Sequence, residues 1–252
     1  MKNKKVLYLV ITAILAALVV VLQIVGGIPV GPFTITLTLF PIVVGAVVLG
    51  PSAGLILGLI FGVVVSVLSI TGKDPGGFMV FSANPWIAWP MCLLKGAAAG
   101  VVPALAYRLF SKHEKAAMVF TYGLTGAFIF LGGAALAWKL AGKTFWVQFG
   151  WTAGLMLVAG GILVGMHFLF KNENSAAYIA SVLAPICNTG IFVAGMLLFF
   201  RDLLSQWSGG TNVAIYALTG LVGVNFIIEF LVAVVLTPAL VAIANFAKKR
   251  GY

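Results

Sequence analysis

Hydrophobic stretches long enough to cross a lipid bilayer constrain this chain more than any short motif. Residues 6–28 read VLYLVITAILAALVVVLQIVGGI, and a second run of this kind occupies residues 213–246. A helix of about 20 apolar residues spans the hydrocarbon core of a membrane. Only 8% of the 252 residues are charged, against about 25% in soluble domains. The chain is therefore predicted to be a multi-pass integral membrane protein.

The apolar pattern predicts an all-α, polytopic helix bundle that forms a single transmembrane domain over residues 1–252. In the stretch PFTITLTLF (32–40) threonine alternates with apolar residues, so we expect the outer part of the second span to be extended or a broken helix. The longer connections, rich in Gly and Pro, are expected on the outer side and suggest a lid or a mouth. They cover residues 26–34, 71–85 and 201–212. The predicted spans are 6–28, 36–49, 51–70, 86–110, 116–140, 146–170, 176–200 and 213–246.

The net charge of +10 reflects topology rather than a nucleic-acid surface. Lysine and arginine lie at the ends of the apolar runs, and with a cytoplasmic N-terminus most of them fall on the inner side, as the positive-inside rule requires. Both chain ends are then cytoplasmic, and no nucleic-acid partner is expected. The inner set is Lys2, Lys4, Lys5, Arg108, Lys112, Lys115, Lys171 and the residues 248–250; the outer set is Lys73, Lys139, Lys143 and Arg201.

Glycine recurs at every fourth position in GPSAGLILGLIFG, at Gly50, Gly54, Gly58 and Gly62. This spacing is close to one helical turn, so the four glycines are predicted to form a bare stripe on which another helix packs closely. Either a helix of this chain or a partner protein fits such a groove. We expect a neighbouring helix of the same chain, the first one, for Gly54 and Gly58.

Two ionisable residues lie near the middle of predicted spans, where a charge costs about 2.5–3.5 kcal/mol. They are Lys95 and Glu229, and Asn225 shares a helical face with Glu229 because it lies four residues earlier. Asn188 and Thr189 fall at similar depth. These residues predict a polar pocket. The alternative is that Lys95 and Glu229 pair with each other and only join two helices.

Asn84 and Trp86 lie where the span 86–110 enters the membrane from the outer side. Either an aromatic belt or ligand stacking accounts for a tryptophan there.

The sequence gives no support for catalysis, and we expect the protein not to be an enzyme. No histidine lies at the depth of the buried serines, and His113 and His167 lack the neighbours of a metal site. Cys92 and Cys187 lie in apolar segments, which favours buried free thiols over a disulfide. We expect no catalytic residue, metal or cofactor. Because the chain also lacks a nucleotide-binding motif, ATP-driven transport would need a second chain.

The order of several segments resembles the substrate-binding S components of energy-coupling factor (ECF) transporters. The resemblance covers residues 5–112 and 175–246, and segment 116–170 departs from it as an apparent two-helix insertion. The segments that carry it are ITAILAALVVVLQ, GPFTITLTLFPIVVGAVVLGPSAGLILGLIFGVVVSVLS, NPWIAWPMCLLKGAAAG, APICNTGIFVAGMLLFF and GLVGVNFIIEFLVAVVLTPAL.

The resemblance implies a six-helix core in a prokaryotic plasma membrane that captures a vitamin or related micronutrient from outside. It also implies three partner subunits, namely a membrane T component, which would contact the first helix at Ala13 and Ala17, and two ATPase subunits. The family pocket maps onto Asn84, Trp86, Lys95, Asn188, Asn225 and Glu229.

Riboflavin is the first candidate substrate. A pocket with Lys, Glu and two Asn suits a ligand with amide-like edges, with or without a carboxylate, and tryptophans at its mouth suit a flat heterocycle. Pantothenate, folate, niacin, cobalamin and nucleobase precursors also fit the sequence. Two other functions use the same residues: an ion-coupled carrier with Glu229 as its coupling carboxylate, and a membrane scaffold without transport.

Overall fold

The computed structural model describes residues 2–30, 33–35, 37–113, 115–123, 126, 175–210, 212–216 and 223–249. The expected insertion at 116–170 lies outside these residues, apart from helical residues 116–123 and residue 126. Its assignment as an insertion therefore stays a prediction.

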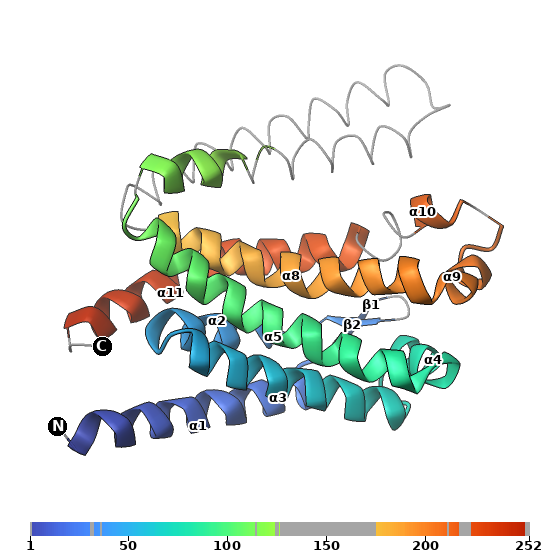
Figure 1. Ribbon diagram of the computed structural model, residues 1–252, viewed down its shortest axis with the longest axis horizontal. Helices are drawn as coiled ribbons and strands as arrows, with labels where there is room; N and C mark the ends of the chain where they lie inside the picture. The colour runs from blue at the N-terminus through green and yellow to red at the C-terminus, as the bar shows by residue number, and fades with distance from the viewer. Residues whose placement is uncertain are drawn as a thin grey trace.

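Five of the described helices are long and apolar enough to cross a membrane, and they lie side by side in one bundle (Figure 1). This arrangement confirms the predicted polytopic helical fold. The five long helices are α1 (Lys2–Val25), α3 (Pro51–Ile70), α5 (Pro85–Phe110), α8 (Ser175–Phe199) and α11 (Gly223–Lys249).

The second expected span, 36–49, is short for a bilayer, and its helix is shorter still. Helix α2 (Leu39–Val48) has 10 residues, or about 15 Å, half of what a bilayer requires. Before it, β1 (Ile28–Val30) and β2 (Phe33–Ile35) form an antiparallel hairpin in which Pro29 lies opposite Thr34. The alternating threonines thus correctly indicated extended backbone. Eight residues of α2 are buried, so the other helices shield this short element.

Two of the expected connections contain short helices. Helix α4 (Pro75–Ala83) lies within 71–85, and α9 (Arg201–Trp207) lies within 201–212. The last expected span is described as α10 (Val213–Tyr216) and α11, and residues 217–222 between them are outside the described part.

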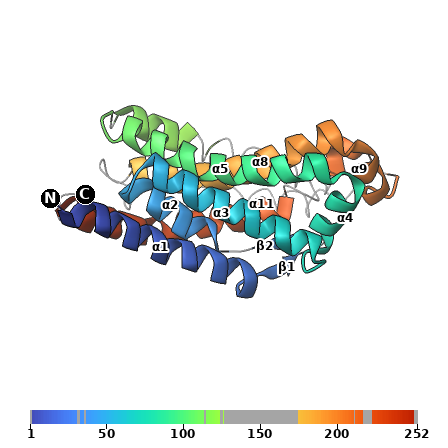
Figure 2. The same ribbon diagram turned by 60° about the horizontal axis from the view of Figure 1, so that its bottom comes forward.

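The two ends of the bundle are formed by different segments of the chain. Both chain termini lie at one end, together with the end of α5 that carries Arg108, while the hairpin, α4 and α9 lie at the opposite end (Figures 1 and 2). This agrees with the topology predicted from the charges, so we call these two ends the inner and outer ends.

The glycine stripe of α3 packs against α5, and the expectation that α1 is its partner is wrong. A Cβ atom added at Gly58 would collide with the backbone of Gly96, and one at Gly54 would collide with that of Gly100. Gly62 faces the backbone at Cys92. Because α5 carries its own glycines four residues apart, two bare helix faces meet, which allows closer approach than α1 would offer.

Gly50 has a different role from the other three glycines. It precedes α3 at the turn from α2, with φ of 97°, a backbone conformation that glycine adopts at little cost. A side chain here would also meet the guanidinium group of Arg108. Gly50 therefore belongs to the turn and not to the helix contact.

Candidate functional site

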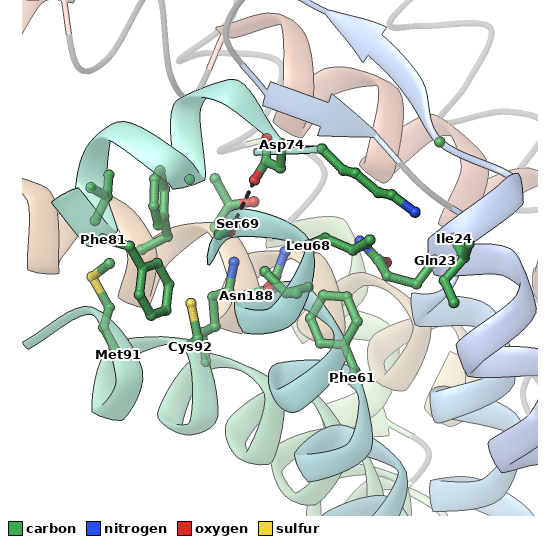
Figure 3. Close-up of a pocket in the computed structure, with 18 of the residues that line it drawn as sticks. Gln23, Ile24, Phe61, Leu68, Ser69, Asp74, Phe81, Met91, Cys92 and Asn188 are labelled. Carbon is green, nitrogen blue, oxygen red and sulfur yellow. Dashed lines mark hydrogen bonds between the residues drawn. The ribbon is translucent and has the colours of Figure 1, made fainter. Parts of the chain in front are cut away.

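A cavity of about 340 Å³ lies in the outer half of the bundle, between α1, α3, α4, α5, α8 and α11 (Figure 3). Its size is at the lower end of the roughly 300–1,000 Å³ of small-molecule sites. Polar side chains from six segments reach it: Gln23, Ser69, Lys73, Asp74, Lys95, Asn188, Thr189 and Glu229.

Lys95 is the buried cation of this cavity. It lies in the first half of α5 and is only 9% exposed. Its Nζ atom is 5.1 Å from the centroid of the Phe192 ring and 5.9 Å from that of Phe61. An aromatic face attracts a cation at this range, so the two rings help α5 to hold an ammonium group inside the bundle.

Asn188, Thr189 and Glu229 form the polar wall on the α8 and α11 side. The Thr189 hydroxyl donates a hydrogen bond of 3.1 Å to the Glu229 carboxylate, which links the two helices. Asn188 is 8% exposed, and its Oδ1 atom is buried without a hydrogen-bond partner. A buried acceptor without a donor costs free energy, which a bound ligand can recover.

The structure brings Lys95 and Glu229 to the same cavity without a direct ion pair among the described residues. Lys95 contacts aromatic rings, whereas Glu229 accepts from Thr189. The alternative that Lys95 and Glu229 only pair with each other to join two helices requires an ion pair. The described residues do not show this ion pair.

Asn84 and Trp86 are not among the described residues that line the cavity. Asn84 caps α5 instead, since its side chain accepts a hydrogen bond of 3.3 Å from the Ile87 N–H group. Trp86 is 88% exposed, as expected of an aromatic belt at a membrane surface. Asn225 falls within α11, but its side chain lies outside what the structure describes.

Among the described residues, the aromatic lining of the cavity comes from phenylalanine rather than tryptophan. Phe61, Phe81 and Phe192 reach the cavity from α3, α4 and α8. The Phe81 ring meets that of Trp89 edge to face, with a centroid distance of 5.8 Å, which fixes its orientation behind the cavity wall.

Asp74 and Ser69 are the main lining residues that the sequence reasoning missed. The Ser69 hydroxyl donates to Asp74 Oδ2 over 3.4 Å, and Asp74 Oδ1 is buried without a partner. Burial raises the pKa of this carboxyl group, while the charge of Lys95 and the hydrogen bonds from Ser69 and from the Gly77 backbone N–H oppose the shift. One signal was available, because Asp74 is one of only five acidic residues in the chain.

Comparison with known families adds an independent finding. The family model described as "ECF transporter, substrate-specific component" matches residues 7–153, more than half of the chain. The match includes α1 to α5 and runs into the segment 116–170, whereas α8 and α11, which carry Asn188 and Glu229, lie beyond it. No protein of curated function matches the sequence significantly.

Proposed function

Because the chain belongs to the family of ECF transporter substrate-specific components, we propose that its outer cavity captures a water-soluble vitamin or related micronutrient. As a member of this family, the protein is a multi-pass subunit of a prokaryotic membrane importer. Capture of a small molecule, rather than chemistry on it, is the task of such a subunit.

The observation that carries the proposal is the concentration of charge in the cavity. Two lysines and two acidic residues line it, although charged residues make up only 8% of the chain. A buried charge in a membrane protein is expensive and marks a functional site by default. The unpaired Asn188 oxygen adds an acceptor that a ligand can satisfy.

Riboflavin remains the first candidate, for reasons that differ from those given by the sequence. A cavity of about 340 Å³ suits a small vitamin better than cobalamin or folate, which are larger molecules. Phenyl rings on its walls favour a flat ring system. The mixture of donors and acceptors suits the amide-like edge of such a ring.

Energy for transport would come from a T component and two ATPase subunits. The first helix presents Ala13 and Ala17, both exposed in the bundle, four residues apart. Small residues at this spacing allow another helix to approach closely, which supports α1 as the contact surface for the T component.

The proposal is tested with protein purified in detergent. Mass spectrometry identifies any small molecule that co-purifies, and quenching of riboflavin fluorescence gives the affinity for the first candidate. Asn188→Ala and Glu229→Gln are each expected to weaken binding about tenfold or more, because each removes a buried polar partner. Gln206→Ala, at an exposed position of α9, is the control and should bind as wild type.

One result would contradict the assignment of the cavity. If Asn188→Ala and Glu229→Gln lower the melting temperature but bind the ligand as tightly as wild type, these residues hold the bundle together and do not contact substrate.

A further inference from the structure

Asp74 is a charged residue of the cavity that also occupies the N-cap position of α4. It follows the outer end of α3 and precedes α4, so it lies at the outer side of the cavity (Figure 3). Its side chain is half-buried, and Oδ1 has no hydrogen-bond partner. The bond from Ser69 to Oδ2 is 3.4 Å long, near the limit for a hydrogen bond. The backbone N–H group of Gly77 also acts on this carboxyl group, so the free acceptor capacity of Asp74 lies at Oδ1.

The local structure holds this carboxylate in one place. A Cβ atom added at Gly77, in the first turn of α4, would collide with Ser69 Oγ and Asp74 Oδ2. The glycine at position 77 therefore leaves room for the Ser69–Asp74 pair against the helix. Three residues from two neighbouring segments combine to position one acidic group.

The charges that face Asp74 come from three elements. Lys73 is its neighbour in the chain, Lys95 reaches the cavity from α5, and Glu229 reaches it from α11. Lys73 is exposed, so water and salt screen its charge. Lys95 is buried and acts electrostatically on both Asp74 and Glu229. Two carboxyl groups thus share one buried ammonium group.

We propose that Asp74 is a specificity-determining residue that makes the cavity select uncharged or cationic ligands with N–H or O–H donors over anionic ones. This inference rests on the proposed function, and it narrows the substrate class. A donor on the ligand pairs with the free acceptor capacity of Asp74. A carboxylate or phosphate in the same position meets a like charge and leaves that acceptor unpaired, which is how binding sites reject close analogues.

The test uses probes that differ mainly in charge. Riboflavin is compared with riboflavin 5′-phosphate, and nicotinamide with nicotinate, by titration calorimetry on the purified full-length chain. In each pair that wild type binds, the uncharged compound is expected to bind at least tenfold more tightly than the anionic compound. Asp74→Asn keeps the shape of the side chain but removes its charge. The ratio of the affinity for the uncharged compound to that for the anionic compound is therefore expected to fall at least fivefold.

Two matched variants separate this role from general effects of charge. Asp202→Asn removes an exposed acidic residue at the same outer end, on α9, and Arg201→Gln removes the exposed cation next to it. Both are expected to keep the wild-type preference within about twofold. A change in the ratio of two affinities is a readout that a purely structural role of Asp74 would not produce.

The outcomes distinguish this inference from the proposed function. If wild type binds the anionic member of a pair, or the carboxylates pantothenate or biotin, more tightly than every uncharged probe, the inference is overturned and vitamin capture stands. An unchanged preference in Asp74→Asn overturns it equally. If no probe binds and no small molecule co-purifies, the proposed function fails, and the inference fails with it.

Discussion

At the scale of single residues, Asp74 is expected to lower the stability of the ligand-free protein. Burial raises the pKa of its carboxyl group above the ordinary value of 3.8, so the folded state binds this proton more tightly than the unfolded state. The contribution of Asp74 to the free energy of unfolding therefore falls as the pH rises from about 4 through the raised pKa. Asp74→Asn removes this loss, because the amide carries no charge at any of these pH values.

Thermal unfolding of the ligand-free protein in detergent checks this expectation. The melting temperature of Asp74→Asn should match that of wild type at about pH 4 and exceed it at about pH 7. Asp202→Asn should follow wild type throughout. A variant that is less stable than wild type at about pH 7 would mean that the carboxylate holds the fold together.

Lys95 is expected to matter for ligand binding more than for folding. In Lys95→Met a flexible apolar side chain replaces the ammonium group between Phe61 and Phe192, where it keeps the packing against both rings. Replacement of a buried charge by an apolar group of similar size often costs little stability. Calorimetry should show at least a tenfold loss of ligand affinity, while the melting temperature changes by only a few degrees.

The contrary result for Lys95 is equally clear. Wild-type affinity together with a large loss of stability would make Lys95 a structural residue, in line with the helix-joining alternative.

At the scale of secondary-structure elements, the contact between α3 and α5 is the most sensitive to added volume. In Gly58→Ala the new methyl group would collide with the backbone of Gly96, so the two helices must separate. Overpacking of this kind costs about 1–3 kcal/mol. Gly58→Leu, with a larger side chain, is expected to prevent folding. Unfolding by heat or by denaturing detergent measures both effects.

Gly190→Ala provides the matched control for the helix contact. Gly190 lies inside α8, is exposed, and has no atom within 4 Å of an added Cβ. Alanine there should be neutral or stabilise the helix by up to about 1 kcal/mol. If Gly58→Ala and Gly190→Ala behave alike, close packing of α3 on α5 does not limit stability.

The sequence alone predicted the features that depend on a short stretch of the chain. A run of about 20 apolar residues specifies a membrane span, and a charge at mid-span is too costly to be incidental. Lys95 and Glu229 were found in this way, Asn188 and Thr189 were found as polar residues at similar depth, and the structure places all four at one cavity.

Other features depended on which helices meet, and the sequence alone did not determine that. Small residues occur on α1, α3 and α5 alike, so the partner of the glycine stripe followed only from the tertiary arrangement. Asp74 was missed because acidic residues are ordinary in connecting segments. The role of Asn84 had a readable signal, since Asn directly before Pro85 is typical of a helix N-cap.

At the scale of the whole molecule, α1 is expected to bind the T component. Ala13→Trp places a large ring on the exposed face of α1 and should abolish co-purification with the T component and the ATPase subunits. Ligand affinity should stay at the wild-type value, because the described lining of the cavity includes Gln23 and Ile24 of α1 but not Ala13. Both are measured on the same purified material.

The control for α1 is a bulky substitution on another lipid-facing helix. Val235, on α11, is 72% exposed, and Val235→Trp should leave assembly intact. Normal assembly of Ala13→Trp would contradict α1 as the contact surface.

Uptake into proteoliposomes tests the central claim most directly, namely that this chain captures a substrate and depends on other subunits for energy. The purified chain alone should bind the ligand without nucleotide but accumulate none inside the vesicles. Accumulation should appear only when the T component, both ATPase subunits and ATP are added. Uptake by the chain alone that collapses with the proton or sodium gradient would contradict the account and would identify an ion-coupled carrier.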